Sequence, residues 1–199
     1  MAATAGIVKP NAFIAGALPQ AGAARLLSQF GLTVLGTLIL TLSAKYKVVL
    51  GPVDMSLQTL AVMGIAACFG LRLGVATVAL YLFEGAMGLP VFQGTPEKGV
   101  GLAYMMGPTG GYLLGFLVMA AIVGWAADRG WDRSVASFLP VLLAAEAAMM
   151  FLGFAWLAAI FGTDAAWTAG VLPFIAPDLV KVGLAAAALP LAWSVRAKP

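Results

Sequence analysis

Long apolar runs, rather than alternating or one-sided patterns, dominate this chain. A helix needs about 20 consecutive apolar residues to cross a bilayer. Runs near that length lie at residues 22–44, 57–70, 72–89, 110–127, 135–161 and 176–195. The second run is short, and Arg72 marks the small gap between it and the third. The pattern predicts an all-α protein with six transmembrane helices, and five spans with a re-entrant segment is the alternative.

The connection between the third and fourth runs is too long for a simple turn. It is bounded by Leu89–Gly94 and by Gly107–Tyr112, is rich in glycine and aromatic residues, and holds the acid–base pair Glu97 and Lys98. A short link suffices to join adjacent membrane helices. A folded loop of this length therefore indicates a lid or a binding surface.

Composition places the whole chain in a membrane. Of 199 residues, 62% are hydrophobic and 10% charged, and the mean hydropathy is +1.01, whereas soluble domains are roughly half apolar. No polar stretch is long enough to form a soluble domain. We therefore expect a single membrane domain over residues 1–199, with a tail at 1–21, a six-helix bundle at 22–195 and a second tail at 196–199. Lys9, Pro10 and Pro19 interrupt the first tail, so it does not resemble a signal sequence and we expect it to be retained.

Basic residues are shared unequally between the two sides that six crossings create. Seven lie on the side of the termini, namely Lys9, Arg25, Arg72, Arg129, Arg133, Arg196 and Lys198. Three lie on the other side, namely Lys45, Lys47 and Lys98. The positive-inside rule then predicts a multi-pass protein of the inner (cytoplasmic) membrane with both termini cytoplasmic. The connections at 45–56, 90–109 and 162–174 face outside and can converge on one outward-facing pocket.

Asp178 and Lys181 are the strongest candidates for a binding site. They stand three residues apart near the start of the last helix, and this spacing puts them on one helix face. Ionisable residues within a membrane segment are functional candidates because burying an unpaired charge is costly. The alternative is a helix-start acid beside a lysine that reaches to the interface.

Two further carboxyl groups lie within apolar runs. Glu84, close to the outer end of the third run, can either line the pocket or reach the interface. Glu146 lies deeper in an Ala-rich stretch, where an interhelical hydrogen bond and a role in transport are equally good interpretations. We expect the charges of the inner connection to be solvated, and contact with a partner protein is the alternative; these are Asp128, Arg129, Asp132 and Arg133.

Amides and aromatic residues supply the remaining candidates. Gln58 and Gln93 can both donate and accept hydrogen bonds, which suits a neutral polar ring, although either can be an ordinary surface amide. Apolar walls for a ligand are offered by aromatic residues, which also commonly anchor membrane interfaces; these are Phe92, Tyr104, Tyr112 and Phe174.

Several chemistries are excluded by the residues present. The chain has no histidine, and Cys68 is its single cysteine, so zinc motifs, a Ser-His dyad and an internal disulfide are impossible. Gly94 to Gly99 has the glycine spacing of a phosphate loop, but Val100 stands where the lysine is needed. We expect no enzyme, no catalytic residues, no metal, no cofactor and no nucleic-acid partner. Energy for transport against a gradient would come from another subunit.

Several short motifs, in their order and spacing, resemble the BioY family, the biotin-binding S components of energy-coupling factor (ECF) transporters. The similarity runs from about Gly51 to Phe116 and resumes at Phe174 to Lys181. The motifs are Gly51-Pro52-Val53, Leu57-Gln58-Thr59-Leu60, Tyr81 with Gly85, Gly88-Leu89-Pro90-Val91-Phe92 and Gly107-Pro108-Thr109-Gly110-Gly111-Tyr112. The chain departs from the family's common form at Thr95-Pro96-Glu97-Lys98 and at Leu113, where some members have arginine.

The resemblance implies a six-helix fold with an external pocket capped by the first and third loops. It implies high-affinity capture of biotin, and then docking on a transmembrane coupling protein driven by two ATPase subunits. Asp178 and Lys181 match the family's ligand-contacting pair. Family members tend to carry small residues spaced by four on the first helix, where the nearest match here is Thr33, Thr37 and Thr41, a stripe that ordinary packing explains equally well.

The polar groups of biotin suit these candidates. Its ureido ring carries two N–H donors and one carbonyl acceptor. Asp178, Gln58 or Gln93 can accept hydrogen bonds, and Lys181 or the backbone N–H groups of Gly110 and Gly111 can donate them. Lys181 can instead bind the valerate carboxylate, and Phe92, Tyr112 and Leu57 suit the apolar part. An S component for a different vitamin and a membrane assembly factor are the alternatives.

Overall fold

The long helices predicted from the apolar runs are present in the computed structural model, which describes residues 12–14, 18–19, 22–49 and 54–196. Within that part of the chain, five helical stretches are long and apolar enough to cross a membrane. They are α1 (Gly22–Lys45), α2 (Gln58–Ala86), α4 (Gly110–Ala127), α5 (Val135–Phe161) and a last stretch, 163–195, that contains most of α7 (Ile175–Arg196). Most of the predicted first tail, the motif at 51–53 and residues 197–199 lie outside the described residues.

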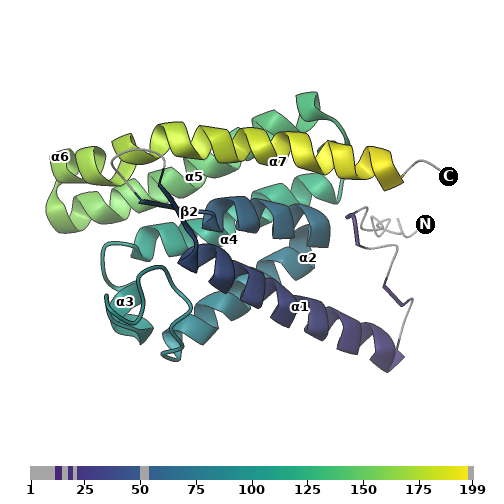
Figure 1. The fold of residues 1–199 in the computed structure, drawn as a ribbon, viewed down its shortest axis with the longest axis horizontal. Coiled ribbons are helices and arrows are strands. Elements are labelled where there is room, and N and C mark those ends of the chain that lie inside the picture. Colours follow the sequence, from purple (N-terminus) through teal and green to yellow (C-terminus); the bar gives the residue numbers. More distant parts are fainter. Residues whose placement is uncertain (1–11, 15–17, 20–21, 50–53, 197–199) are drawn as a thin grey trace, which may run out of the picture.

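Helix α2 contains a sharp reversal at Gly70, where φ is +76° and ψ is −179°. This backbone conformation favours glycine, which has no Cβ to clash with its own carbonyl groups. Residues at similar distances before and after Gly70 meet across the turn: a Cβ on Gly74 would lie 3.0 Å from the Ala66 Cα, and Gln58 donates to the Tyr81 hydroxyl. Figure 1 shows α2 turning back on itself in this way. The two halves correspond to the predicted runs at 57–70 and 72–89.

The connection between α1 and α2 is a small antiparallel hairpin, made of β1 (Lys47–Val49) and β2 (Asp54–Ser56), with Lys47 opposite Ser56. The protein is otherwise helical, as predicted, and no pattern in the sequence indicated this hairpin. Strands of three residues are too short to show the alternation of polar and apolar positions by which a strand is recognised in a sequence. The hairpin ends directly on α2 and so places Ser56 beside the first turn of that helix.

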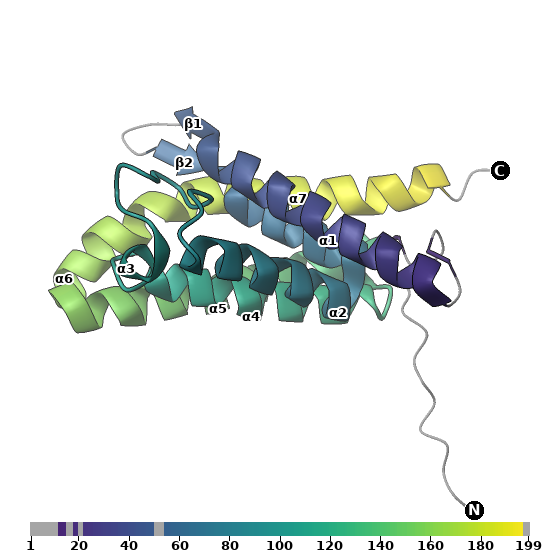
Figure 2. The ribbon, with the colours of Figure 1, turned by 90° about the horizontal axis from the view of Figure 1, so that it is seen from below.

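Four further short elements gather at the same end of the bundle as the hairpin. They are α3 (Gly101–Met105) in the long loop, and α6 (Thr163–Ala165), the π-helical η3 (Ala166–Val171) and the 3₁₀ turn η4 (Leu172–Phe174) between α5 and α7. Figure 2 shows β1, β2, α3 and α6 at one end, with the start of α1 and the end of α7 at the other. We call the first the loop end and the second the turn end, because it also holds the Gly70 reversal.

Partly buried hydrogen bonds join the elements of the turn end. The Leu71 N–H, exposed by the reversal in α2, donates to Asp128 Oδ2 at 3.1 Å, and Trp193 Nε1 donates to Asp132 Oδ2 at 2.6 Å. Asp132, in η2 (Trp131–Arg133), is completely buried, and this burial raises its pKa. The expectation that this connection is merely solvated is therefore wrong for Asp132, because α7 folds over it.

The threonine stripe of α1 is used inside the molecule. Thr33 and Thr37 are buried, and the Thr37 hydroxyl donates to Glu84 Oε1 on α2 at 3.0 Å. Gly36 lies against Thr77 of α2 so closely that a Cβ would overlap it. Of the two interpretations of the stripe, these contacts favour ordinary packing between α1 and α2.

Candidate functional site

A pocket opens at the loop end, between the hairpin, the long loop, the starts of α2, α4 and α7, and the middle of α5. Its wall combines polar groups from the start of α2 and from α7 with aromatic and thioether side chains. The lining residues are Ser56, Gln58, Thr59, Phe92, Gln93, Tyr104, Thr109, Tyr112, Leu113, Phe116, Met149, Met150, Phe174, Asp178 and Lys181. Segments that are far apart in the sequence therefore build one site.

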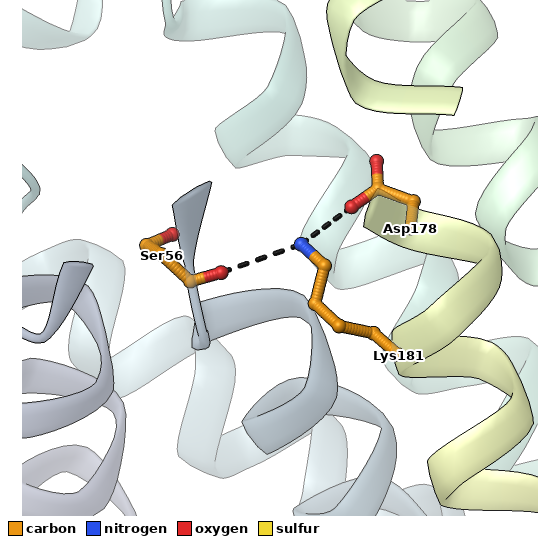
Figure 3. A network of polar contacts seen from close by, with 3 residues as sticks. All are labelled: Ser56, Asp178 and Lys181. Atoms are coloured by element: carbon orange, nitrogen blue, oxygen red, sulfur yellow. Dashed lines mark hydrogen bonds and ion pairs between the residues drawn. The ribbon is translucent and has the colours of Figure 1, made fainter. Parts of the chain in front are cut away.

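An ion pair between Asp178 and Lys181 forms the polar side of the pocket. The two side chains lie in the first turns of α7, three residues apart, and both residues are 5% exposed. Lys181 Nζ also donates to the backbone carbonyl of Ser56 at 3.3 Å. Figure 3 shows the lysine reaching from α7 to both oxygen atoms. Because both charged groups are buried and each is the other's partner, their relative position is fixed. A site that recognises polar groups requires such fixed positions.

Phe92 forms the aromatic wall on the loop side. Its ring stacks on Tyr104 at 5.1 Å between centroids and meets Tyr81 edge-on at 5.4 Å. The ring also lies directly over Gly85 of α2, where any Cβ would overlap it. With 1% of its surface exposed, Phe92 is locked in place by these three neighbours.

Side chains from three helices clamp the backbone of residues 91–95, which we call the clamped segment. Tyr81 donates to the Val91 carbonyl at 3.0 Å, and Tyr104 donates to the Gln93 carbonyl at 2.7 Å. Lys45, at the end of α1, donates to the carbonyls of residues 92 and 95. Burial raises the pKa of the Tyr104 phenol, which keeps its donor proton. The long loop is thus tied to α1, α2 and α3 where it carries Phe92 and Gln93 into the pocket.

Tyr112 and the floor of the pocket come from α4 and α5. The Tyr112 hydroxyl donates to the Gly170 carbonyl of η3 at 2.6 Å, and its ring packs against Gly153 of α5, where a Cβ would overlap it. Met149 and Met150 approach from α5. Thioether side chains adapt to irregular shapes, which suits a floor beneath a small ligand.

The structure brings most of the predicted site residues together. Those that line the pocket are Asp178, Lys181, Gln58, Gln93, Phe92 and Tyr112, and the suggested aromatic walls Tyr104 and Phe174 join them. Three of the predicted residues, and Leu57, are placed elsewhere. Glu84 bonds to Thr37, Gly110 lies against Trp156 and the Met105 carbonyl, and Gly111 lies against the Leu152 carbonyl. The two glycines allow α4 to approach its neighbours closely.

Sequence reasoning missed one polar residue with a free group. Thr59 lines the pocket, and its hydroxyl is buried without a hydrogen-bond partner among the described residues. Thr59 belongs to the Leu57–Leu60 motif, but nothing in the sequence distinguishes it from a threonine packed between helices. Ser56, Thr109, Met149 and Met150 were also missed as lining residues.

The arrangement is suited to holding a small, partly polar molecule. Ligand pockets combine apolar walls with a few polar groups that fix orientation, and this pocket has that division. Donors and acceptors come from the hairpin, the start of α2, α7 and the long loop, which supplies Gln93 and Thr109, whereas aromatic and methionine side chains form most of the rest.

Comparisons with known proteins agree with this geometry. The BioY family model matches residues 15–198. A probable biotin transporter BioY from Pyrococcus horikoshii is 34% identical over 157 residues, which cover 79% of this chain and 91% of the relative. The biotin transporter BioY of Thermotoga maritima is 36% identical over 151 residues, 75% of this chain and 86% of the relative.

A solved structure is similar to this fold. It is a crystal structure of the S component for biotin from an ECF-type ABC transporter, with a TM-score of 0.73 and 21% sequence identity over 87% of this chain and 95% of the other. The two chains therefore share a fold across nearly their whole length.

Proposed function

The chain belongs to the BioY family, which confirms the resemblance of its sequence motifs, and on that premise we propose that it captures biotin for uptake across the cytoplasmic membrane. The observation that carries the proposal is the buried Asp178–Lys181 pair at one side of a pocket that aromatic and methionine side chains also line. In this proposal the protein binds and carries its ligand without changing it chemically.

The chemistry of biotin matches the two sides of the pocket. A carboxylate accepts hydrogen bonds from the N–H groups of the ureido ring, a role that suits Asp178, and the Lys181 ammonium or the Thr59 hydroxyl donates to its carbonyl. The thioether ring and the aliphatic chain suit the surfaces of Phe92 and Tyr112. A pocket built this way rejects analogues that leave its buried polar groups unpaired.

We further propose six membrane crossings, with the two halves of α2 counted separately and the loop end outside. The reversal at Gly70 supports the count. Arg25, Arg72, Arg129 and Arg133 belong to elements of the turn end, whereas Lys45 and Lys98 belong to the loop end. By the positive-inside rule, this asymmetry favours a cytoplasmic turn end, with both termini inside, and a pocket open to the exterior.

Uptake is proposed to depend on partners, namely a transmembrane coupling protein and two ATPase subunits. The whole chain would act as one membrane domain in that assembly. The side of α1 that faces away from α2 is available for lipid or for the coupling protein, because Leu27, Phe30 and Leu42 are exposed there.

Titration calorimetry on the detergent-purified protein tests the ligand assignment. We expect saturable one-to-one binding of biotin and no binding of thiamine or riboflavin. Binding of one of those vitamins in place of biotin would keep the fold and overturn the assignment.

Thr59→Val tests the free hydroxyl of the pocket. Valine has nearly the same shape and lacks the hydroxyl, so we expect biotin affinity to fall by about threefold to tenfold, the value of one hydrogen bond between neutral groups. Thr77→Val is the matched control, because Thr77 lies on the same helix and its hydroxyl bonds within that helix, to the Leu73 carbonyl. An equal loss in both variants, or no loss in Thr59→Val, would contradict a contact between Thr59 and the ligand.

A further inference from the structure

Glu146 is a buried acid that lies outside the lining of the pocket. It lies in the middle of α5 with 7% of its surface exposed, and neither carboxyl oxygen has a hydrogen-bond partner among the described residues. A buried polar group without a partner is costly, and more so within a membrane. An ionisable group in such a position is therefore a candidate for a functional role.

The position of Glu146 connects it to the pocket. It precedes Met149 and Met150 of the pocket floor by one helical turn, so it lies directly behind that floor. Helix α5 packs against α7, and the charged neighbours that act on Glu146 are Asp178 and Lys181, with Asp178 the stronger influence. Two acids and one base therefore meet at the contact between α5 and α7.

The charges of this trio constrain its hydrogen bonds. Lys181 balances one carboxylate, and a second carboxylate beside the first would be repelled by it in a dry environment. The trio becomes neutral when the two carboxyl groups share one proton. In that state one acid donates a hydrogen bond to the other, and one of the two Glu146 oxygen atoms gains a partner.

We propose that Glu146 is a positioning residue that shares a hydrogen bond with Asp178 and thereby holds the Asp178 carboxylate against Lys181 in the geometry that the ligand meets. The proposal rests on the proposed function, since the effect is measured as biotin affinity. Glu146 acts through Asp178 and is not itself a lining residue of the pocket.

Two substitutions of similar size separate a hydrogen-bonding role from simple filling of space. Glu146→Gln keeps a donor for Asp178, so we expect its biotin dissociation constant to stay within about threefold of the wild type. Glu146→Leu fills the same space without a donor, and we expect the constant to rise by at least about tenfold. Leu143→Ala, one turn away on the exposed side of α5, controls for changes in the helix itself.

Infrared spectroscopy of the wild type supplies a second measurement that does not depend on the ligand. We expect a carbonyl band of a protonated carboxyl group that is lost in Glu146→Gln. Unchanged binding by Glu146→Leu, an equal loss in both Glu146 variants, or absence of that band would each overturn the proposal. Failure of the wild type to bind biotin would instead overturn the proposed function, and the infrared band would still decide whether the two acids share a proton.

Discussion

Lys181→Met is expected to weaken biotin binding by roughly tenfold to a hundredfold. A hydrogen bond made by a charged group contributes about 1.5–3 kcal/mol, and each 1.4 kcal/mol is a factor of ten in affinity. Lys181 is the only basic side chain that lines the pocket among the described residues, so no other cation there replaces it. The loss is measured by titration calorimetry.

The same substitution is expected to lower the stability of the protein, because it leaves the Asp178 carboxylate buried without its counter-charge. Removing one partner of a buried ion pair costs about 3–5 kcal/mol. Adding Asp178→Asn to Lys181→Met removes the orphaned charge, so we expect the double variant to regain thermal stability without regaining affinity. If the double variant did not regain thermal stability, and Asp178→Asn alone bound biotin like the wild type, the pair would have no role in binding.

Bilayer length explains why the helices were predictable from the sequence. An apolar run that spans a membrane satisfies its backbone as a helix whatever its neighbours are, so the runs at 110–127 and 135–161 coincide with α4 and α5. The pairing of Asp178 with Lys181 was predictable for a similar reason, since residues three apart on one helix meet locally. In both cases the information lies within a few turns of the chain.

The rest of the site depends on contacts between distant segments, which no local pattern reveals. Glu84 was predicted to line the pocket or to reach the interface, yet it bonds to Thr37 of α1. Glu146, for which the sequence suggested an interhelical hydrogen bond or a role in transport, instead has Asp178 of α7 as a charged neighbour. Gly110 and Gly111 were predicted to donate backbone hydrogen bonds to a ligand. In the structure, the absence of a Cβ at these two residues lets α4 approach its neighbours closely. Thr59 and Met149 become pocket residues only once α2, α5 and α7 are assembled.

Gly85→Ala is expected to disrupt the clamped segment and to speed the dissociation of biotin by about tenfold or more. The added methyl group would occupy the space of the Phe92 ring, and Tyr81 and Tyr104 leave the ring nowhere else to go. Overpacking of this kind typically costs 1–3 kcal/mol, roughly tenfold to a hundredfold in the population of the intact arrangement. Displacing Phe92 also disturbs the hydrogen bonds that Lys45, Tyr81 and Tyr104 donate to the carbonyl groups of the clamped segment.

Gly64→Ala makes the same chemical change in the same helix at a position with open space around it. We expect it to leave the dissociation rate unchanged and to raise thermal stability slightly, because alanine favours a helix more than glycine does. Adding Phe92→Leu to Gly85→Ala shortens the side chain that the new methyl group meets, so it restores stability if the clash is the cause. If Gly85→Ala and Gly64→Ala released biotin at the same rate, the fixed position of Phe92 would not control escape of the ligand, and the clamped segment would serve the fold alone.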